Sequence, residues 1–308
     1  MMSTVSGTPS WSVDPTLNFD RLHIIESLRD PGHATRTGRR LFLELESAWA
    51  TTPLHVEYHA VHDVAEISSL MLRLVSEAQR GYLPILHFEA HGETRRQGKS
   101  TTSRGMILAS GELFSWGEVA PYLIEINKAP RLRLLVFVAT CFGADIATLV
   151  RPLERAPARV LIGPRETISV NTLERGTFAF YRALRGGDGT QAVIDMNLAT
   201  NAAFFPFTAE WLFLTILKGY FNEHTTERHV AARAERIIAP MALAGVSPVR
   251  IAATRRDVRA KLRDRKLVFD ESYRKFFFVD ELPEIADRFR MTFEACFVND
   301  AHLGEVAR

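Results

Sequence analysis

The chain has 308 residues, 46% of them hydrophobic and 24% charged, and its formal net charge at pH 7 is +2. This length and apolar content are enough for one large domain, or for a domain with an appended region, around a real core. So small a net charge excludes polyanion binding through whole-protein electrostatics, and two cysteines in so long a chain exclude a disulfide framework and favour a reducing, cytoplasmic location.

Strand and helix patterns alternate along the first part of the chain. Residues 1–18 are rich in Ser, Thr and Pro, carry no secretory signal and predict a disordered tail. The next expected elements are a strand at 22–28, a helix from 37, a strand at 54–61, a helix from 64 to 80 capped by Asp63, and a strand at 83–90. Strands and helices alternate here as they do in βαβ units, so we expect an α/β fold with a mostly parallel sheet that helices cover on both faces.

The central part of the chain continues this alternation after a polar interruption. Residues 93–104 contain no apolar side chain and predict a mobile surface loop, and residues 106–108 and 112–114 predict a small hairpin. The further expected elements are a helix at 116–127 capped by Ser115, strands at 132–139 and 158–164, a short helix at 145–153, a helix at 171–184 and another from about 190. From about residue 206 the sequence no longer predicts strands and predicts only helices.

The helical region, residues 206–308, contains an apolar cluster and a basic stretch. The cluster, residues 211–217, falls short of the roughly 20 residues that span a bilayer, so it predicts a core helix or an interface and no membrane partner. Residues 228–266 hold eleven Arg and Lys against three acidic residues. A basic run on helices is usually a solvated face, and no aromatic residues interleave here, so nucleic acid is not an expected partner. The phenylalanines at 276–278 and at 289, 293 and 297 are expected to bury this region against the main domain.

Two of the expected strands run directly into residues that carry chemistry. Strand 83–90 continues into His91 and Gly92, and strand 132–139 continues, after Thr140, into Cys141-Phe142-Gly143. The carboxyl ends of parallel strands lie side by side at one edge of an open α/β sheet, where such folds place their sites. We therefore expect His91 and Cys141, 50 residues apart in sequence, to meet at that edge.

Cys141 has two interpretations. It is either a small buried hydrophobic residue, as free cysteines commonly are, or a nucleophile. Its position just past a strand favours the nucleophile, because Gly143 permits a sharp turn and the amides at the start of the following helix would stabilise a thiolate. Cys296 has no such setting and is expected to be a buried hydrophobic residue.

His91 also has two interpretations. It either bonds a backbone carbonyl at the strand end, or it serves as the base for the thiol and the acid for the leaving amine. Gly92 favours the second, because an N–H without a neighbouring side chain can approach a ligand closely, as an oxyanion hole requires. Together with the N–H of Cys141 it would hold the negative oxygen of a tetrahedral intermediate.

The two motifs, residues 86–92 and 138–143, resemble the active-site motifs of the caspase-like CHAT peptidases, relatives of caspases, metacaspases and separase. The gap between the histidine and the cysteine fits the caspase arrangement, and the Cys-x-Gly pattern is present although the preceding Gln is not. Residues 106–113, and residues 180–187 together with Ala192 and Val193, also resemble the CHAT pattern, so the likeness covers roughly residues 80–197.

The resemblance implies a three-layer αβα caspase-like domain over residues 19–205, followed by a helical accessory region, 206–308. It implies a cysteine endopeptidase with the dyad His91 and Cys141, an oxyanion hole formed by Gly92 and Cys141, and a thioester intermediate, with no cofactor and no metal. Bacterial CHAT proteins often act on a protein encoded nearby, frequently in defence against phage, so a protein substrate is expected. The alternative is a catalytically silent caspase-like fold whose basic helical region docks a partner or nucleic acid.

Substrate specificity is less clearly marked in the sequence. Relatives that cut after arginine or lysine, such as metacaspases and clostripain, have an acidic residue two positions before the cysteine, where this chain has Ala139. The resemblance therefore does not imply basic specificity. Asp145, Arg165 and Glu166, on loops at the same sheet edge, are candidates for a substrate pocket, and the alternative for each is an ordinary loop charge.

Two other motifs compete with the peptidase interpretation. Residues 92–100 nearly spell a phosphate-binding P-loop, but five residues separate the glycines where the motif has four, and a helix would have to start at Lys99. His87, Glu89 and His91 alternate on one strand face, a spacing that can chelate zinc. If His87 points into a buried layer, it is instead a hydrogen-bonded core residue.

Overall fold

The computed structural model describes residues 19–29, 36–51, 54–97, 100–151 and 153–298, with side chains left undescribed at 94–102, and the predicted amino-terminal tail lies outside these ranges. The chain divides into two compact units. The first comprises the described residues up to 149 together with 156–211, and the second comprises the described residues of 150–155 and 212–308.

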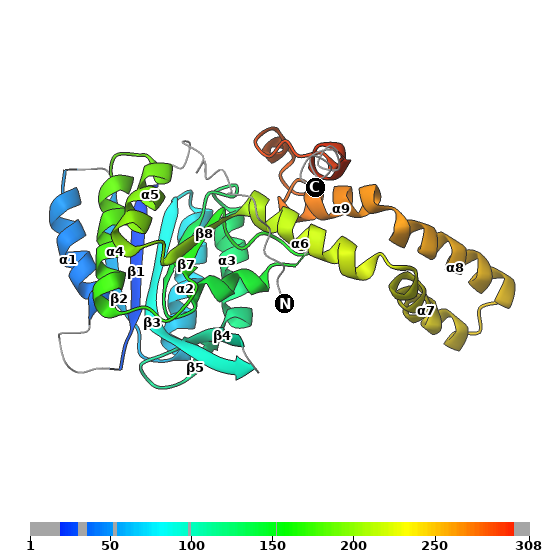
Figure 1. Ribbon diagram of the computed structural model, residues 1–308, viewed down its shortest axis with the longest axis horizontal. Coiled ribbons are helices and arrows are strands. Elements are labelled where there is room, and N and C mark those ends of the chain that lie inside the picture. The colour runs from blue at the N-terminus through cyan, green and yellow to red at the C-terminus, as the bar shows by residue number, and fades with distance from the viewer. Residues whose placement is uncertain (1–18, 30–35, 52–53, 98–99, 152, 299–308) are drawn as a thin grey trace, which may run out of the picture. The chain divides into compact units, whose positions relative to one another are not determined.

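The first unit is built on a mixed sheet (Figure 1). Its strands, over the described residues, are β1 (Arg21–Ser27), β2 (His55–Ala60), β3 (Pro84–Gln97), β4 (Ser100–Ile107), β5 (Leu113–Ser115), β6 (Leu135–Ala139), β7 (Val160–Pro164) and β8 (Phe204–Thr208). The main order is β2-β1-β3-β6-β7-β8, in which the first five are parallel neighbours and β8 is antiparallel to β7. The mostly parallel sheet expected from the sequence is confirmed.

Helices cover both faces of this sheet, so the first unit has three layers. Its helices, over the described residues, are α1 (Thr37–Trp49), α2 (Val64–Gln79), α3 (Trp116–Lys128), α4 (Val170–Leu184) and α5 (Gly189–Thr200). Helices α1, α4 and α5 lie on one face, and α2 and α3 on the other (Figure 1). Asp63 caps α2 by accepting from the N–H of Glu66, and Ser115 begins α3 with a capping box, both as predicted.

An aromatic cluster forms the centre of the core under α4. Phe137, in the middle of β6, is fully buried, and its ring lies 5.3 Å from that of Phe180 and 5.4 Å from that of Phe204. His87 stacks on the same ring at 5.0 Å. These contacts pack the two strands that carry the predicted motifs against one helix, which restricts how the ends of those strands can move.

The prediction of a mobile loop over residues 93–104 is wrong. Strand β3 continues to Gln97, and β4 returns antiparallel to it from Ser100, with Gly92 opposite Met106 and Glu93 opposite Gly105. This ribbon is held by main-chain hydrogen bonds, which leave no apolar pattern in the sequence. The expected hairpin is confirmed by the pairing of Ile107 with Leu113. Because a strand follows residue 99 where a P-loop requires a helix, the P-loop interpretation is wrong as well.

The carboxyl-terminal part of the chain is helical beyond β8, a strand that the sequence analysis missed. Its α-helices, over the described residues, are α6 (Ala209–His224), α7 (Glu227–Leu243), α8 (Pro248–Arg263) and α9 (Arg265–Phe276). The predicted phenylalanine cluster packs within the second unit, where the ring of Phe213 lies tilted against Phe276 at 5.3 Å and edge-on to Phe277 at 5.2 Å. These aromatic residues therefore form a core of that unit itself, which differs from the expectation that they would bury it against the main domain.

Four basic residues of the stretch, Arg255, Arg259, Arg263 and Lys266, are paired with acidic residues. Arg255 and Arg263 of α8 reach Glu235 and Glu227 of α7, with N–O distances of 2.8 and 2.7 Å. In the second unit Arg155 likewise contacts Asp280. Among the described residues, no helix is both long enough and apolar enough to cross a membrane.

Candidate active site

The register of β3 and β6 brings the two predicted motifs to the same place. Ile85 pairs with Leu135 and Glu89 with Ala139, an offset of 50 residues that holds along the whole ladder. Continued by two residues, this register sets His91 beside Cys141. Neighbouring strands lie about 4.8 Å apart. The side chains at 85, 135, 137 and 139 face α1 and α4. His91 has the same parity on β3, so it belongs to the same sheet face.

Gly92 shows directly how close the two motifs are. A methyl group added to its Cα would lie 2.0 Å from the carbonyl oxygen and 3.3 Å from the nitrogen of Cys141. No side chain fits in that space, so glycine is required for the two main chains to approach this closely. The structure therefore brings His91, Gly92 and Cys141 together, as the sequence predicts.

Cys141 sits in a tight turn that ends β6. The N–H of Gly143 donates to the carbonyl of Thr140 over 3.0 Å, and Phe142 adopts a φ of 56°. This left-handed conformation is uncommon for a bulky residue and costs on the order of 1–3 kcal/mol. The N–H of Phe142 donates to the carbonyl of Glu166, 3.2 Å away. The loop that contains Glu166 thus stabilises the turn around Cys141 through this hydrogen bond.

A close-packed backbone supports this turn. A methyl group at Gly143 would lie 2.5 Å from the carbonyl oxygen of Val138, and one at Gly163 would lie 2.6 Å from the carbonyl carbon of Gly143. The expected α-helix at 145–153 is a shorter 3₁₀ helix, Gly143–Leu149. The sharp turn that glycine permits is confirmed, but the helix that follows has fewer aligned peptides than the sequence analysis assumed.

The two residues predicted to form a dyad are both at least partly exposed to solvent. His91 is exposed and Cys141 is half-buried. Cys296, which was expected to be buried, is half-buried in a π-helical turn, Glu294–Val298. A nucleophile needs this accessibility, but because both cysteines have it, exposure alone does not distinguish Cys141 from Cys296.

The zinc interpretation of β3 does not fit the side chains of that strand. His87 is buried, with Nδ1 2.9 Å from the hydroxyl of Tyr181 and Nε2 2.9 Å from Glu89. Glu89 is also buried and accepts a hydrogen bond from Thr37. Both residues thus belong to a hydrogen-bonded core network, which was the alternative given for His87.

The three candidate specificity residues lie around the turn but are differently engaged. Asp145 accepts from the N–H of Ser103 over 2.5 Å, and burial raises the pKa of its carboxyl. Arg165 is exposed, with its guanidinium 3.5 Å above the ring of Phe205, and partial burial lowers its pKa. Glu166 is exposed and contributes its backbone carbonyl to the cysteine turn. Ala139, at the position of the specificity acid in basic-cutting relatives, is buried.

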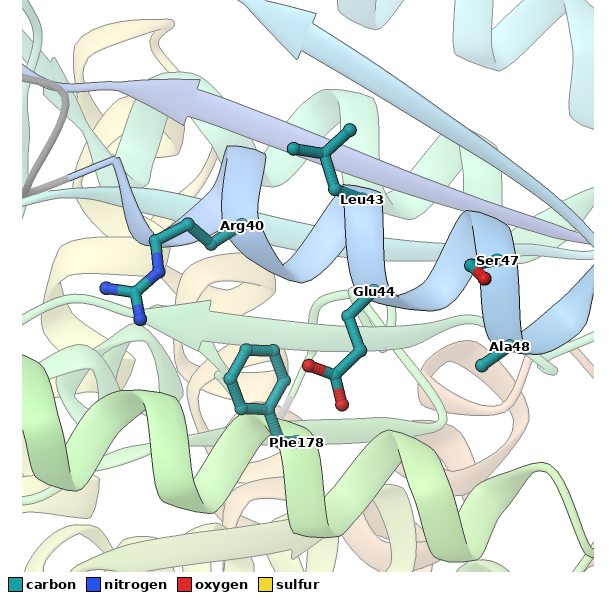
Figure 2. Close-up of a pocket in the computed structure, with 6 residues that line it drawn as sticks. All are labelled: Arg40, Leu43, Glu44, Ser47, Ala48 and Phe178. Carbon is teal, nitrogen blue, oxygen red and sulfur yellow. The ribbon is translucent and has the colours of Figure 1, made fainter.

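A surface depression of about 590 Å³ lies away from these strand ends, between α1 and α4 (Figure 2). Arg40, Leu43 and Glu44 of α1 line it, and Phe178 of α4 faces them (Figure 2). It contains none of the predicted site residues, and its two charged lining residues, Arg40 and Glu44, both come from α1.

A second group of titratable side chains lies on β1 and β2, and the sequence analysis missed it. Burial lowers the pKa of His23 to about 3, with smaller contributions from His59, Arg21 and Arg73. Burial also lowers the pKa of His59 to about 4, helped by Arg73. The alternation of histidine and glutamate in His55-Val56-Glu57-Tyr58-His59 was the signal that could have drawn attention to this strand.

Comparison with known proteins adds no relative to this picture. None of the protein-family models matches the chain, and no curated protein matches it. The function of the site must therefore be argued from its own residues and geometry.

Proposed function

We propose that this chain is a caspase-like cysteine endopeptidase in which Cys141 is the nucleophile and His91 the general base. The observation that carries the proposal is the close approach of Gly92 to the main chain of Cys141, which joins two motifs 50 residues apart at one sheet edge. The resemblance of those motifs to the CHAT peptidases gives this pair of residues its chemical meaning. The three-layer α/β architecture is compatible with a caspase-like fold.

In the proposed reaction His91 takes the proton of the Cys141 thiol, and the thiolate attacks the carbonyl carbon of a peptide bond. The carbonyl oxygen then carries the negative charge of the tetrahedral intermediate. His91 returns the proton to the leaving amine, and a thioester remains on Cys141. Water attacks this thioester, giving up a proton to His91, and the carboxylic acid product leaves as the thiol reforms.

The hydrogen bonds of the turn limit which amides can stabilise the oxyanion. The N–H groups of Phe142 and Gly143 already donate to the carbonyls of Glu166 and Thr140. The proposal therefore assigns this role to the N–H groups of Gly92 and Cys141, the pair expected from the sequence. The strained φ of Phe142 supports the assignment, because backbone strain of this kind clusters at functional turns.

The expected substrate is a protein, and the site offers no acid at residue 139 to bind a basic side chain. Asp145 is engaged by the N–H of Ser103, which leaves Arg165 and Glu166 as the exposed charges of the predicted set. Recognition of the residue before the cut through these two side chains remains part of the proposal, as does a partner encoded nearby.

Cleavage of a peptide library by the purified chain tests the proposal. We expect cleavage by the wild type and by the matched control Cys296→Ser, none by Cys141→Ala, and a rate lower by roughly 10²- to 10⁴-fold in His91→Ala. Iodoacetamide should label Cys141 faster than Cys296, with the difference read by mass spectrometry.

Equal cleavage by the wild type and Cys141→Ala would end the peptidase proposal. An unreactive Cys141, together with salt-sensitive binding of a partner by the chain, would instead favour the silent binding module. Its candidate surface is α8, which contains no buried residue. The pairing of Arg255 and Arg263 with carboxylates of α7 weakens the case for a nucleic-acid partner.

A further inference from the structure

Three side chains that bind metals well converge on the sheet face covered by α2. His23 comes from β1, and Glu57 and His59 come from the edge strand β2. His23 pairs with Glu57 across the two strands, and His59 follows Glu57 on the same face. Within the described part of the chain this is the one group of three such residues whose ligand atoms all lie within 4.8 Å of one another.

The distances within this group fit a single ion. Nδ1 of His23 lies 3.1 Å from Nε2 of His59, and Oε2 of Glu57 lies 3.8 Å from the first and 3.7 Å from the second. Two ligands on a tetrahedral ion with bonds of about 2.0–2.1 Å stand about 3.3–3.4 Å apart. The three atoms therefore form a triangle of nearly the size that one ion requires.

A second carboxylate, that of Glu77, lies next to the His23 ring on the side away from the other two residues. The other ring nitrogen of His23, Nε2, lies 3.5 Å from Oε2 of Glu77 on α2. That oxygen is buried and has no hydrogen-bond partner. A histidine that binds a metal through one nitrogen commonly donates its other N–H to a carboxylate, which fixes its orientation.

We propose that His23, Glu57 and His59 bind a divalent transition-metal ion of the Zn²⁺ class, with Glu77 orienting His23. Two imidazoles and one carboxylate are a zinc-type donor set, whereas Mg²⁺ and Ca²⁺ prefer oxygen ligands. Water fills the fourth position, because the Glu57 side chain is one-third exposed and opens the group to solvent. Arg73 contacts Nδ1 of His59 at 3.3 Å and also lies 4.0 Å from Oε1 of Glu77.

This site is separate from the peptidase centre. His23 pairs with Leu86, which precedes His91 by five residues, or about 16 Å along the strand. The ion therefore joins the edge strand β2 to β1 and has no contact with Cys141. Its effect is structural, since it holds an edge strand that has a neighbour on one side only in the main sheet order.

Metal binding by the full-length protein tests the inference without any activity assay. After treatment with a chelator and removal of the chelator, the wild type is titrated with zinc sulfate and the bound metal is counted by mass spectrometry. We expect one zinc per chain, and visible bands of four-coordinate cobalt when Co²⁺ replaces it. Zinc should raise the melting temperature of the wild type.

Variants assign the site to these residues. His59→Ala is expected to abolish stoichiometric binding, and Glu77→Gln to weaken it by roughly 10- to 100-fold. His55→Ala is the matched control, because His55 is an exposed histidine on the same strand and the same face, and it should bind like the wild type. Circular dichroism checks that each variant is folded.

Two results would overturn the inference. If the folded wild type binds no zinc, the group is a metal-free hydrogen-bonded cluster of Arg73, His59 and His23. If His59→Ala binds zinc as tightly as His55→Ala, the ion sits elsewhere. Should His59→Ala fail to fold, the wild-type stoichiometry and the Glu77→Gln affinity still decide the question.

Discussion

Replacing Gly92 with alanine should push apart the two chain segments that carry His91 and Cys141. The new methyl carbon would lie 2.0 Å from the carbonyl oxygen of Cys141. Carbon and oxygen ordinarily approach to about 3.3 Å. The segment of β3 around Gly92 and the turn after β6 must therefore move apart by more than about 1 Å. The clash is with backbone, so no rotation of a flexible side chain can relieve it.

The size of the effect follows from this overlap. Overpacking a tight interior contact costs about 1–3 kcal/mol, so the free energy of unfolding of the first unit should fall by that amount. A displacement of about 1 Å between reacting groups can reduce a rate by 10²-fold. Gly92→Ala should therefore lose much of the reactivity of Cys141 while the fold survives.

Urea unfolding followed by circular dichroism measures the stability, and the rate of iodoacetamide labelling measures the reactivity of Cys141. The control is Gly219→Ala in α6, where an added methyl group meets no atom within 4 Å and should raise helix stability by about 0.5–1 kcal/mol. If Gly92→Ala matched the wild type in both measurements, the inferred contact between the two motifs would be wrong.

Two further substitutions probe the sheet beneath the site. Phe137→Ala removes a fully buried ring and should lower the free energy of unfolding by about 3–5 kcal/mol; a loss below 1 kcal/mol in urea unfolding would contradict the packing described. Burial raises the pKa of Glu26 above its ordinary 4.5, so its contribution to stability is present below that pH and is lost as the pH rises through the folded-state pKa. Urea unfolding at a series of pH values should therefore show that the free energy of unfolding of the wild type, relative to that of Glu26→Gln, falls between pH 4.5 and the folded-state pKa. A difference that stays constant or rises with pH would contradict the raised pKa.

Local patterns in the sequence predicted most of the helices and strands and both residues of the proposed dyad. Buried strands were visible as apolar runs, helices as three- and four-residue spacing, and the caps at Asp63 and Ser115 as their side-chain chemistry. The positions of His91 and Cys141, just beyond two buried apolar runs, followed from the same patterns, and the parallel order followed from the alternation of strands with helices.

Tertiary structure decided what depends on pairing between distant segments. The ribbon of β3 and β4 is made by main-chain hydrogen bonds between polar residues, which apolar periodicity does not reveal. The offset of 50 residues between β3 and β6, and with it the contact of Gly92 with Cys141, is a property of sheet register. The group of His23, Glu57 and His59 likewise exists only because β1 and β2 lie side by side, since His23 precedes the other two residues by more than thirty residues of chain.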